Sequence, residues 1–193
     1  MGEAVRILSE GMPLIFPTDT VWGLGVSVGH CESPKALFDI KGRESGKPVA
    51  WLVGSIDDIG RYGSNVPDYA KDLAEKHWPG ALTIIVKASA NVPEEFRSNE
   101  GTIGLRMPAS ETALDLIRSV GCPLAVTSAN ISGGSAIPAS QSFDFDAAGF
   151  DCPASVALCE NDADASAIGN IASTVVDCTG PFPVVLRNGP VDI

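Results

Sequence analysis

The feature that most constrains the fold is an alternation of short apolar runs and helical patterns, each bounded by proline or glycine. Runs such as Pro13–Pro17 and Leu82–Val86 are continuous and short, which is typical of buried strands. Between such runs, helical spacing gathers apolar side chains on one face, as in Glu111–Val120, which is followed by Gly121. A chain of this kind packs helices against a sheet, so the sequence predicts an α/β domain.

The expected elements extend over the whole chain, with about seven or more strands and about four helices. Further strands are expected at 23–28, 48–53, 102–107, 123–127, 155–158, 171–177 and 183–187. Further helices are expected at 67–78 and at 33–41, the latter with Ser33 as N-cap. Because helices do not regularly follow strands, we expect a mixed sheet rather than a parallel one. No linker divides residues 1–193, so a single domain is expected.

The charge balance limits the classes of partner. The chain has 13 basic and 24 acidic residues and a net charge of −11. A protein that binds nucleic acid through its whole surface needs many cations, so this class is excluded. A local basic cluster lies between positions 35 and 47, and it is interpreted either as an anion pocket or as a solvated loop; it consists of Lys35, Lys41, Arg43 and Lys47.

Cysteine spacing and the termini indicate the compartment. The five cysteines form no C-x-x-C pair, and only two histidines accompany them, so no zinc spacing is recognisable. We expect free, buried thiols in a reducing cytosol. Residues 1–10 lack the layout of a signal peptide, and no apolar stretch is long enough to cross a bilayer. A cytoplasmic protein without membrane contact is therefore expected.

Three polar segments adjoin the expected strands: Pro17–Gly25 (PTDTVWGLG), Lys41–Lys47 and Thr127–Gly133 (TSANISG). Each alone could be turn and cap chemistry. Together they offer hydroxyls, cations and glycine-rich backbone at strand ends, where α/β sheets bind ligands. Gly42–Lys47 is one residue short of a P-loop, and Pro48 replaces its Ser or Thr, so that nucleotide signature is excluded. Two connections, 88–100 and 132–151, are longer than usual and are interpreted as lids or mobile loops.

These segments occur with HWPGALT (His77–Thr83), LRMP (Leu105–Pro108), STVVD (Ser173–Asp177) and LRNG (Leu186–Gly189) in one order. In that order the chain resembles the YrdC/TsaC family over about Gly11–Gly189. The resemblance implies an open twisted mixed sheet with flanking helices and a basic concave cavity. It implies a short, single-domain threonylcarbamoyl-AMP synthase, which joins L-threonine, bicarbonate and ATP and releases pyrophosphate.

The resemblance also implies partners. Magnesium would be carried with ATP. The product would supply a downstream transferase complex that modifies an adenosine beside the tRNA anticodon, and direct RNA binding by the chain itself would be weak or absent.

The resemblance further implies roles for particular residues. Lys41 and Arg43 are expected to act in catalysis, Lys41 by holding the carbamate or the phosphates. The ATP contacts are expected to be Arg43, Lys47, Thr102, Asn130 and Arg187. Arg106 is expected to pair with the threonine carboxylate. The remainder of the amino-acid pocket is expected to comprise Thr18, Thr20, Ser128 and Ser173.

Other interpretations of these residues stay open. Arg106 and Arg187 each end an expected strand, where a structural ion pair is the ordinary explanation. Asp19 could orient a cavity cation or cap a turn. The three tryptophans are interpreted as core residues, and His77 is assigned no catalytic role.

The chain departs from the family pattern at Trp22, Ser110 and Ala172 and in the loop after Gly133, which bears on amino-acid specificity and on an ATP contact of the loop. Two rival functions stay open. One is a paralogous ATP-dependent carbamoyl-adenylating enzyme, and the other is an RNA-binding module that uses the same cavity.

Overall fold

A computed structural model of the chain describes residues 1–42, 49–149, 157–158 and 171–193. Its helices are α1 Gly2–Ser9, α2 Lys35–Lys41, α3 Asp58–Tyr62, α4 Asp68–His77, α5 Glu111–Val120 and α6 Phe145–Ala148, with a 3₁₀ turn at Glu94–Phe96. Its strands are β1 Leu14–Phe16, β2 Gly23–Ser27, β3 Ala50–Leu52, β4 Leu82–Lys87, β5 Thr102–Arg106, β6 Leu124–Ser128, β7 Ala157–Leu158, β8 Thr174–Asp177 and β9 Val184–Arg187.

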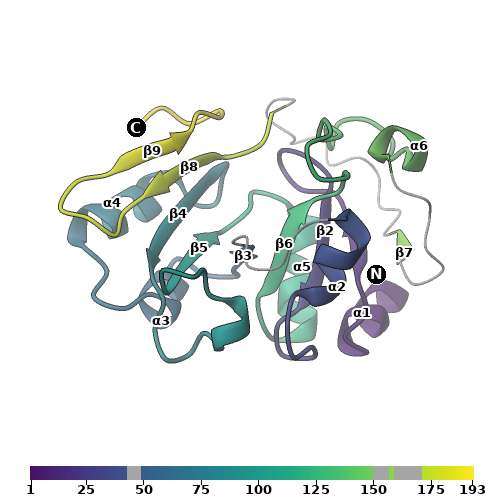
Figure 1. The fold of residues 1–193 in the computed structure, drawn as a ribbon, viewed down its shortest axis with the longest axis horizontal. Coiled ribbons are helices and arrows are strands. Elements are labelled where there is room, and N and C mark those ends of the chain that lie inside the picture. Colours follow the sequence, from purple (N-terminus) through teal and green to yellow (C-terminus); the bar gives the residue numbers. More distant parts are fainter. Residues whose placement is uncertain (43–48, 150–156, 159–170) are drawn as a thin grey trace.

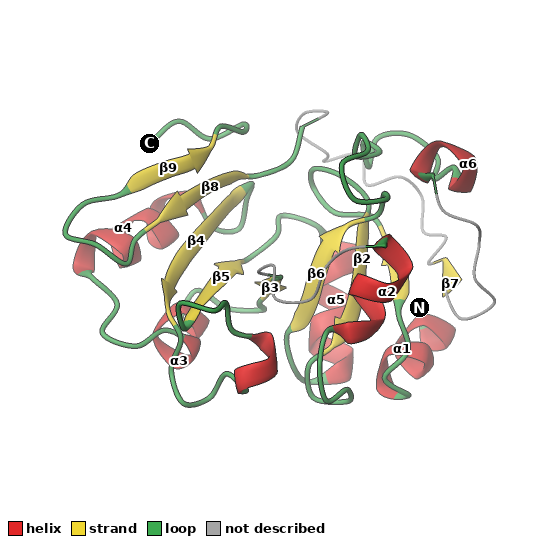
Figure 2. Cartoon of the chain, in the orientation of Figure 1, coloured by secondary structure: helices red, strands yellow, loops and turns green. Residues whose placement is uncertain are grey.

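The strands form one open sheet in the order β7-β1-β2-β6-β3-β5-β4-β8-β9 (Figure 2). Strands β3 and β5, β4 and β8, and β1 and β7 pair in parallel, and the other neighbours pair antiparallel. The predicted mixed α/β sheet is therefore confirmed. Sequence-distant strands such as β2 and β6 become antiparallel neighbours, which brings the polar segment before β2 beside the polar segment after β6.

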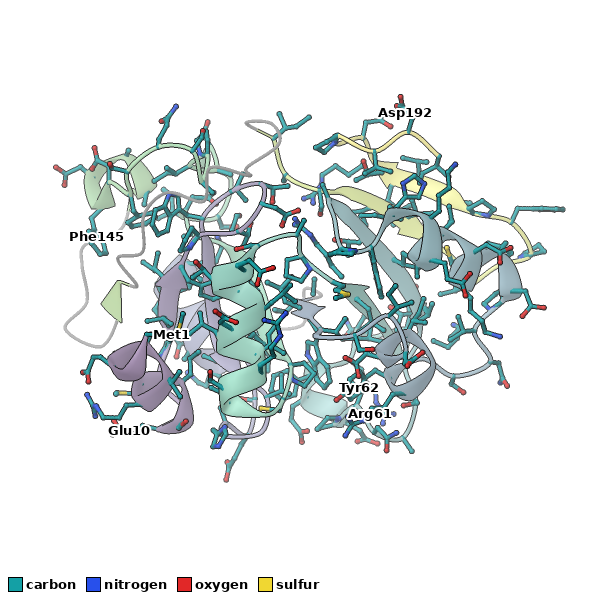
Figure 3. The ribbon with its side chains drawn as sticks, turned by 180° about the vertical axis from the view of Figure 1, so that it is seen from behind. Met1, Glu10, Arg61, Tyr62, Phe145 and Asp192 are labelled. Atoms are coloured by element: carbon teal, nitrogen blue, oxygen red, sulfur yellow. The ribbon has the colours of Figure 1, made fainter. Side chains whose placement is uncertain are left out.

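The core has two parts on opposite sides of β6. Ala125 belongs to a large cluster that includes Trp51 and Ile84. Leu124 belongs to a smaller cluster beneath α1 and α5. Figure 1 shows α2 in front of β2 and β6 with α5 behind them, and Figure 3, seen from the back, shows α5 in front of the same strands. Because side chains alternate along a strand, Val126 and Ser128 share the side of Leu124.

Local signals predicted some elements closely. Helix α5 begins and ends where expected, because the Ser110 hydroxyl accepts from the Ala113 amide and Gly121 adopts a left-handed φ of 74°. In α2 the expectation is wrong by one position: Pro34 occupies the N-cap, and Ser33 lies outside the helix.

Three helices and a 3₁₀ turn are missed, and two of these elements lie within the two long connections. Helix α1 has no side-chain cap, and α3 and α6 have five and four residues, too few for a periodic signal. The 88–100 connection contains a 3₁₀ turn that buries Phe96 against Trp51, with ring centroids 5.6 Å apart. The described part of the 132–151 connection carries α6 and is anchored by ring contacts.

The thiols agree only in part with the expectation. Among the described cysteines all are free, but only Cys178 is buried, while Cys31 and Cys122 are partly exposed. Cys152 and Cys159 lie outside the described residues. No helix in the described ranges has the length and apolarity that a membrane crossing requires.

Candidate functional site

A cavity of about 490 Å³ opens where strands from the middle of the sheet meet the turns that follow them. Its floor contains the small residues Gly23, Ala50 and Gly104, which leave the sheet surface hollow. The cavity shares its side of β6 with the cluster beneath α1 and α5, because Val126 and Ser128 line it. These two helices thus cover part of that face, and the cavity takes up another part.

Every predicted site residue that the structure describes lines this cavity. They are Thr18, Thr20, Lys41, Thr102, Arg106, Ser128, Asn130, Ser173 and Arg187. Arg43 and Lys47 lie outside the described residues. The sheet order explains the convergence. These residues lie in or next to strands that are far apart in the sequence but adjacent or close in the sheet.

Arg106 is held in a buried network at the end of β5. Its Nη2 donates to Asp19 Oδ1 at 2.5 Å, and the two side chains are 7% and 4% exposed. Its Nη1 donates to Thr20 Oγ1 at 3.1 Å, and its Nε donates to the Gly80 carbonyl at 3.0 Å. The structural ion pair considered for Arg106 is thus present, and Asp19 orients a cavity cation.

Arg187 has a different environment at the end of β9. Its Nε donates to the Ser173 carbonyl at 3.0 Å and its Nη2 to Ser173 Oγ at 3.1 Å. No acid among the described residues forms an ion pair with it. Partial burial of the guanidinium, followed by the positive charge of Arg106, lowers the pKa of Arg187. The structural ion pair considered for Arg187 is thus absent from the described part, and an anion in the cavity would relieve this repulsion.

A β-bulge turns Arg187 toward the cavity. Arg187 lies opposite Val175, whereas Val185 lies opposite the next residue, Val176, so Leu186 is an extra residue in β9. With regular pairing Leu186 would face Val175 and the Arg187 side chain would point to the other face of the sheet. The bulge therefore places a cation in the site from an edge strand whose four residues are exposed.

Lys41, the last residue of α2, is 5% exposed. Its ammonium donates to the Ser128 carbonyl at 2.6 Å and to the Asn130 carbonyl. Asn130 Nδ2 in turn donates to the carbonyls of Ile131 and Gly134 at 2.8 Å each. These bonds fix the turn after β6 and keep a third cation in the cavity wall.

Hydroxyls complete the lining. Thr18 Oγ1 donates to the Val21 carbonyl at 2.7 Å and lies 3.2 Å from Thr20 Oγ1. Thr102 Oγ1 lies 2.7 Å from Ser98 Oγ. Sequence reasoning missed Thr83, which lines the cavity and lies 2.9 Å from Ser173 Oγ. The signal that could have found Thr83 is a polar residue within the otherwise apolar run of β4.

The positions that depart from the family pattern have separate places. Trp22 lines the cavity, and its Nε1 donates to the Gln141 carbonyl at 2.8 Å. Its ring lies 5.4 Å from that of Phe143, so it anchors the described part of the loop after Gly133. Ala172 also lines the cavity. Ser110 is the N-cap of α5 and is not part of the lining. All three tryptophans are buried, as predicted.

Comparison with known sequences assigns a family. The profile of the Sua5_yciO_yrdC family, which carries the description telomere recombination, matches residues 6–189. A relative from Mycobacterium tuberculosis (strain ATCC 25618 / H37Rv), named putative threonylcarbamoyl-AMP synthase, is 38% identical over 194 residues, covering 98% of this chain and 83% of the relative.

Comparison with solved structures gives the same fold. The chain is similar to Pyrococcus abyssi Sua5 complexed with L-threonine, with a TM-score of 0.83 and 33% identity over 96% of this chain. It spans 52% of that protein, about half its length. It is also similar to E. coli YciO, with a TM-score of 0.78 and 25% identity, covering 98% of this chain and 89% of YciO.

Proposed function

The chain belongs to the Sua5_yciO_yrdC family, and on that premise we propose that it is an L-threonylcarbamoyladenylate synthase, a nucleotidyltransferase. It would form L-threonylcarbamoyl-AMP and pyrophosphate from L-threonine, bicarbonate and ATP. One observation carries the proposal: the cavity gathers Lys41, Arg106 and Arg187 with eight hydroxyl residues, and Asp19 is paired with Arg106 while Arg187 has no acidic partner among the described residues. Such a site has an excess of positive charge for an anionic ligand.

The proposed reaction fits a site without a protein nucleophile. The threonine amine and bicarbonate give a carbamate and water, and a carbamate oxygen then attacks the α-phosphorus of ATP. A carbamate O–P bond forms, the bond from the α-phosphorus to the bridging oxygen breaks, and pyrophosphate leaves. Two anions must be held together while charge builds on the leaving group, which needs oriented cations and donors.

The environments of the two arginines support different roles. Arg187, which lacks an acidic partner in the described part of the chain, is proposed to contact the ATP phosphates. Arg106 is proposed to pair with the threonine carboxylate through N–H groups that its three bonds leave unused. Lys41 is proposed to contribute charge near the reacting groups while it holds the turn after β6.

The other roles follow from the cavity lining. Thr102 and Asn130 are proposed to place the nucleotide, and Arg43 and Lys47 to contact its phosphates. The amino-acid pocket is proposed to be formed by Thr18, Thr20, Ser128 and Ser173.

Magnesium is proposed to enter with ATP. Asp19, the acid beside the cavity residues, is paired with Arg106, so the oxygens of ATP rather than protein carboxylates would hold the ion. When bound it would neutralise phosphate charge. The product is proposed to pass to a tRNA-modifying transferase in the cytoplasm. Direct RNA binding by the chain itself is proposed to be weak or absent, because a net charge of −11 repels the RNA phosphates.

The test is release of pyrophosphate from ATP with magnesium, with threonine and bicarbonate omitted in turn. Release that requires both supports the synthase. Release without a threonine requirement favours the paralogous adenylating enzyme, and failure to bind ATP contradicts the phosphate contacts. Arg118→Ala is a matched control, because Arg118 lies exposed on α5, outside the cavity lining.

A further inference from the structure

Thr83 is a buried hydroxyl residue of β4 that belongs to a chain of polar groups. Its Oγ1 lies 2.9 Å from Ser173 Oγ, and the two residues are 6% and 4% exposed. The same Ser173 oxygen accepts a hydrogen bond of 3.1 Å from Arg187 Nη2. The chain thus runs from β4, through the residue that precedes β8, to β9, and all three residues line the cavity.

The available protons limit the direction of each hydrogen bond. A guanidinium only donates, so Ser173 Oγ accepts from Arg187 and keeps one lone pair and its proton. Either hydroxyl can donate across the 2.9 Å contact between Thr83 Oγ1 and Ser173 Oγ. When Thr83 donates, the Ser173 proton is left for the cavity, which Ser173 lines.

We propose that Thr83 is a positioning residue for the amino-acid substrate: by donating to Ser173, it directs the Ser173 hydroxyl proton into the cavity beside the Arg187 guanidinium. Both groups then offer only donors, which suits an anionic group of threonine or of its N-carboxylated form, the carbamate, next to the ATP phosphates that Arg187 is proposed to contact. The inference rests on the proposed function, because it takes threonine as the occupant of this part of the cavity.

The geometry separates the effect of Thr83 from that of Arg187. The second bond of Arg187, from Nε to the Ser173 carbonyl at 3.0 Å, does not involve the hydroxyl. Loss of the Thr83 hydroxyl thus leaves Arg187 charged and attached, while Ser173 can turn its proton away from the ligand. The effect should fall on threonine rather than on ATP.

The experiment compares Thr83→Val, which keeps the β-branched shape, with Thr83→Ser, which keeps the hydroxyl. Thr112→Val removes the same group from α5, outside the cavity lining. For Thr83→Val we expect the KM for threonine to rise on the order of tenfold, with the ATP dissociation constant within about twofold of the unsubstituted protein. Thr83→Ser should recover most of the threonine affinity, and Thr112→Val should leave both values unchanged.

Three results would overturn the inference: an unchanged threonine KM in Thr83→Val, an equal loss of ATP affinity, or a Thr83→Ser variant as impaired as Thr83→Val. Thermal unfolding of each variant identifies a folding defect, and in that case Ser173→Ala must reproduce the selective loss of threonine affinity. Calorimetric threonine binding by the unsubstituted protein separates this test from the proposed function. If that protein binds no threonine, the proposed function and the inference both fail.

Discussion

Asp19 and Arg106 form a buried ion pair with an N–O distance of 2.5 Å, and the two residues lie 87 positions apart in the sequence. Arg106 also donates to a threonine hydroxyl and to a backbone carbonyl, so its guanidinium is fixed in position. Partial burial and then the positive charge of Arg106 lower the pKa of Arg187, yet Arg187 has no acidic partner among the described residues. One arginine is thus neutralised and oriented, and the other is left for an anion.

Removing one member of the buried pair should be costly. Asp19→Ala leaves the Arg106 charge buried without a counter-ion, and we expect a loss of about 3–5 kcal/mol in the free energy of unfolding. Urea denaturation measures this loss. Asp19→Ala combined with Arg106→Met should be less destabilising than Asp19→Ala alone, because no buried charge remains. A cost below about 1 kcal/mol for Asp19→Ala would show that water compensates Arg106.

Removing the uncompensated cation should affect turnover much more than stability. Arg187 lies on an exposed edge strand, so Arg187→Ala should leave the unfolding transition nearly unchanged. Loss of a charged contact to the reacting phosphates should lower kcat/KM by about 10²–10³-fold. Arg187→Lys should recover little, because an ammonium cannot reproduce the two-pronged contact of a guanidinium. Turnover of Arg187→Ala equal to that of the Arg118→Ala control would contradict the phosphate contact.

The buried thiol of Cys178 predicts a loss of stability at alkaline pH. Burial, with the negative charge of Asp177, raises the pKa of Cys178 to about 11 from an ordinary 9.0. The folded state therefore keeps a proton that the unfolded state loses, and this contribution is present below pH 9 and disappears as the pH rises toward 11. Cys178→Ala should reduce the fall in unfolding free energy over this window by about 2 kcal/mol. Parallel pH curves for the two proteins would refute this assignment.

Trp22 should anchor the segment that contains Gln141. Trp22→Phe keeps an aromatic ring beside Phe143 but removes the donor to the Gln141 carbonyl, which should cost roughly 0.5–1.5 kcal/mol. Amide hydrogen exchange near Gln141 should accelerate, while exchange in α5 should not change. Trp22→Ala should cost more, about 3–5 kcal/mol, because it also leaves a cavity. Unchanged exchange near Gln141 in Trp22→Phe would show that the ring contacts alone hold this segment.

Local chemistry explains why some elements were predictable. Helix α5 has its cap, its apolar face and its terminal glycine within one short segment, so its bounds agree with the prediction. Helix α1 lacks a side-chain cap and packs on α5, more than a hundred residues away in the sequence. Its helical state therefore depends on a partner that no local pattern reveals.

The site shows the same division. The ordered motifs identified the residues that line the cavity, but they did not show which are paired. Thr83 was missed because one threonine in an apolar run is ordinary in a strand. The bulge at Leu186 was not predictable from the sequence, because a bulge is a relation between β9 and β8 rather than a property of either.

The sequence by itself determined the strand and helix segments with strong local signals and the family motifs whose residues line the cavity. Only the tertiary structure decided the electrostatic role of each cation, because charge compensation depends on which strand ends meet. Arg106 reaches Asp19 because β5 ends beside the turn that precedes β2, whereas Arg187 reaches only Ser173 because a bulge turns it inward from the sheet edge. Local patterns in the sequence cover a few residues, whereas the partners of these two arginines are set by how distant strands are arranged in the sheet.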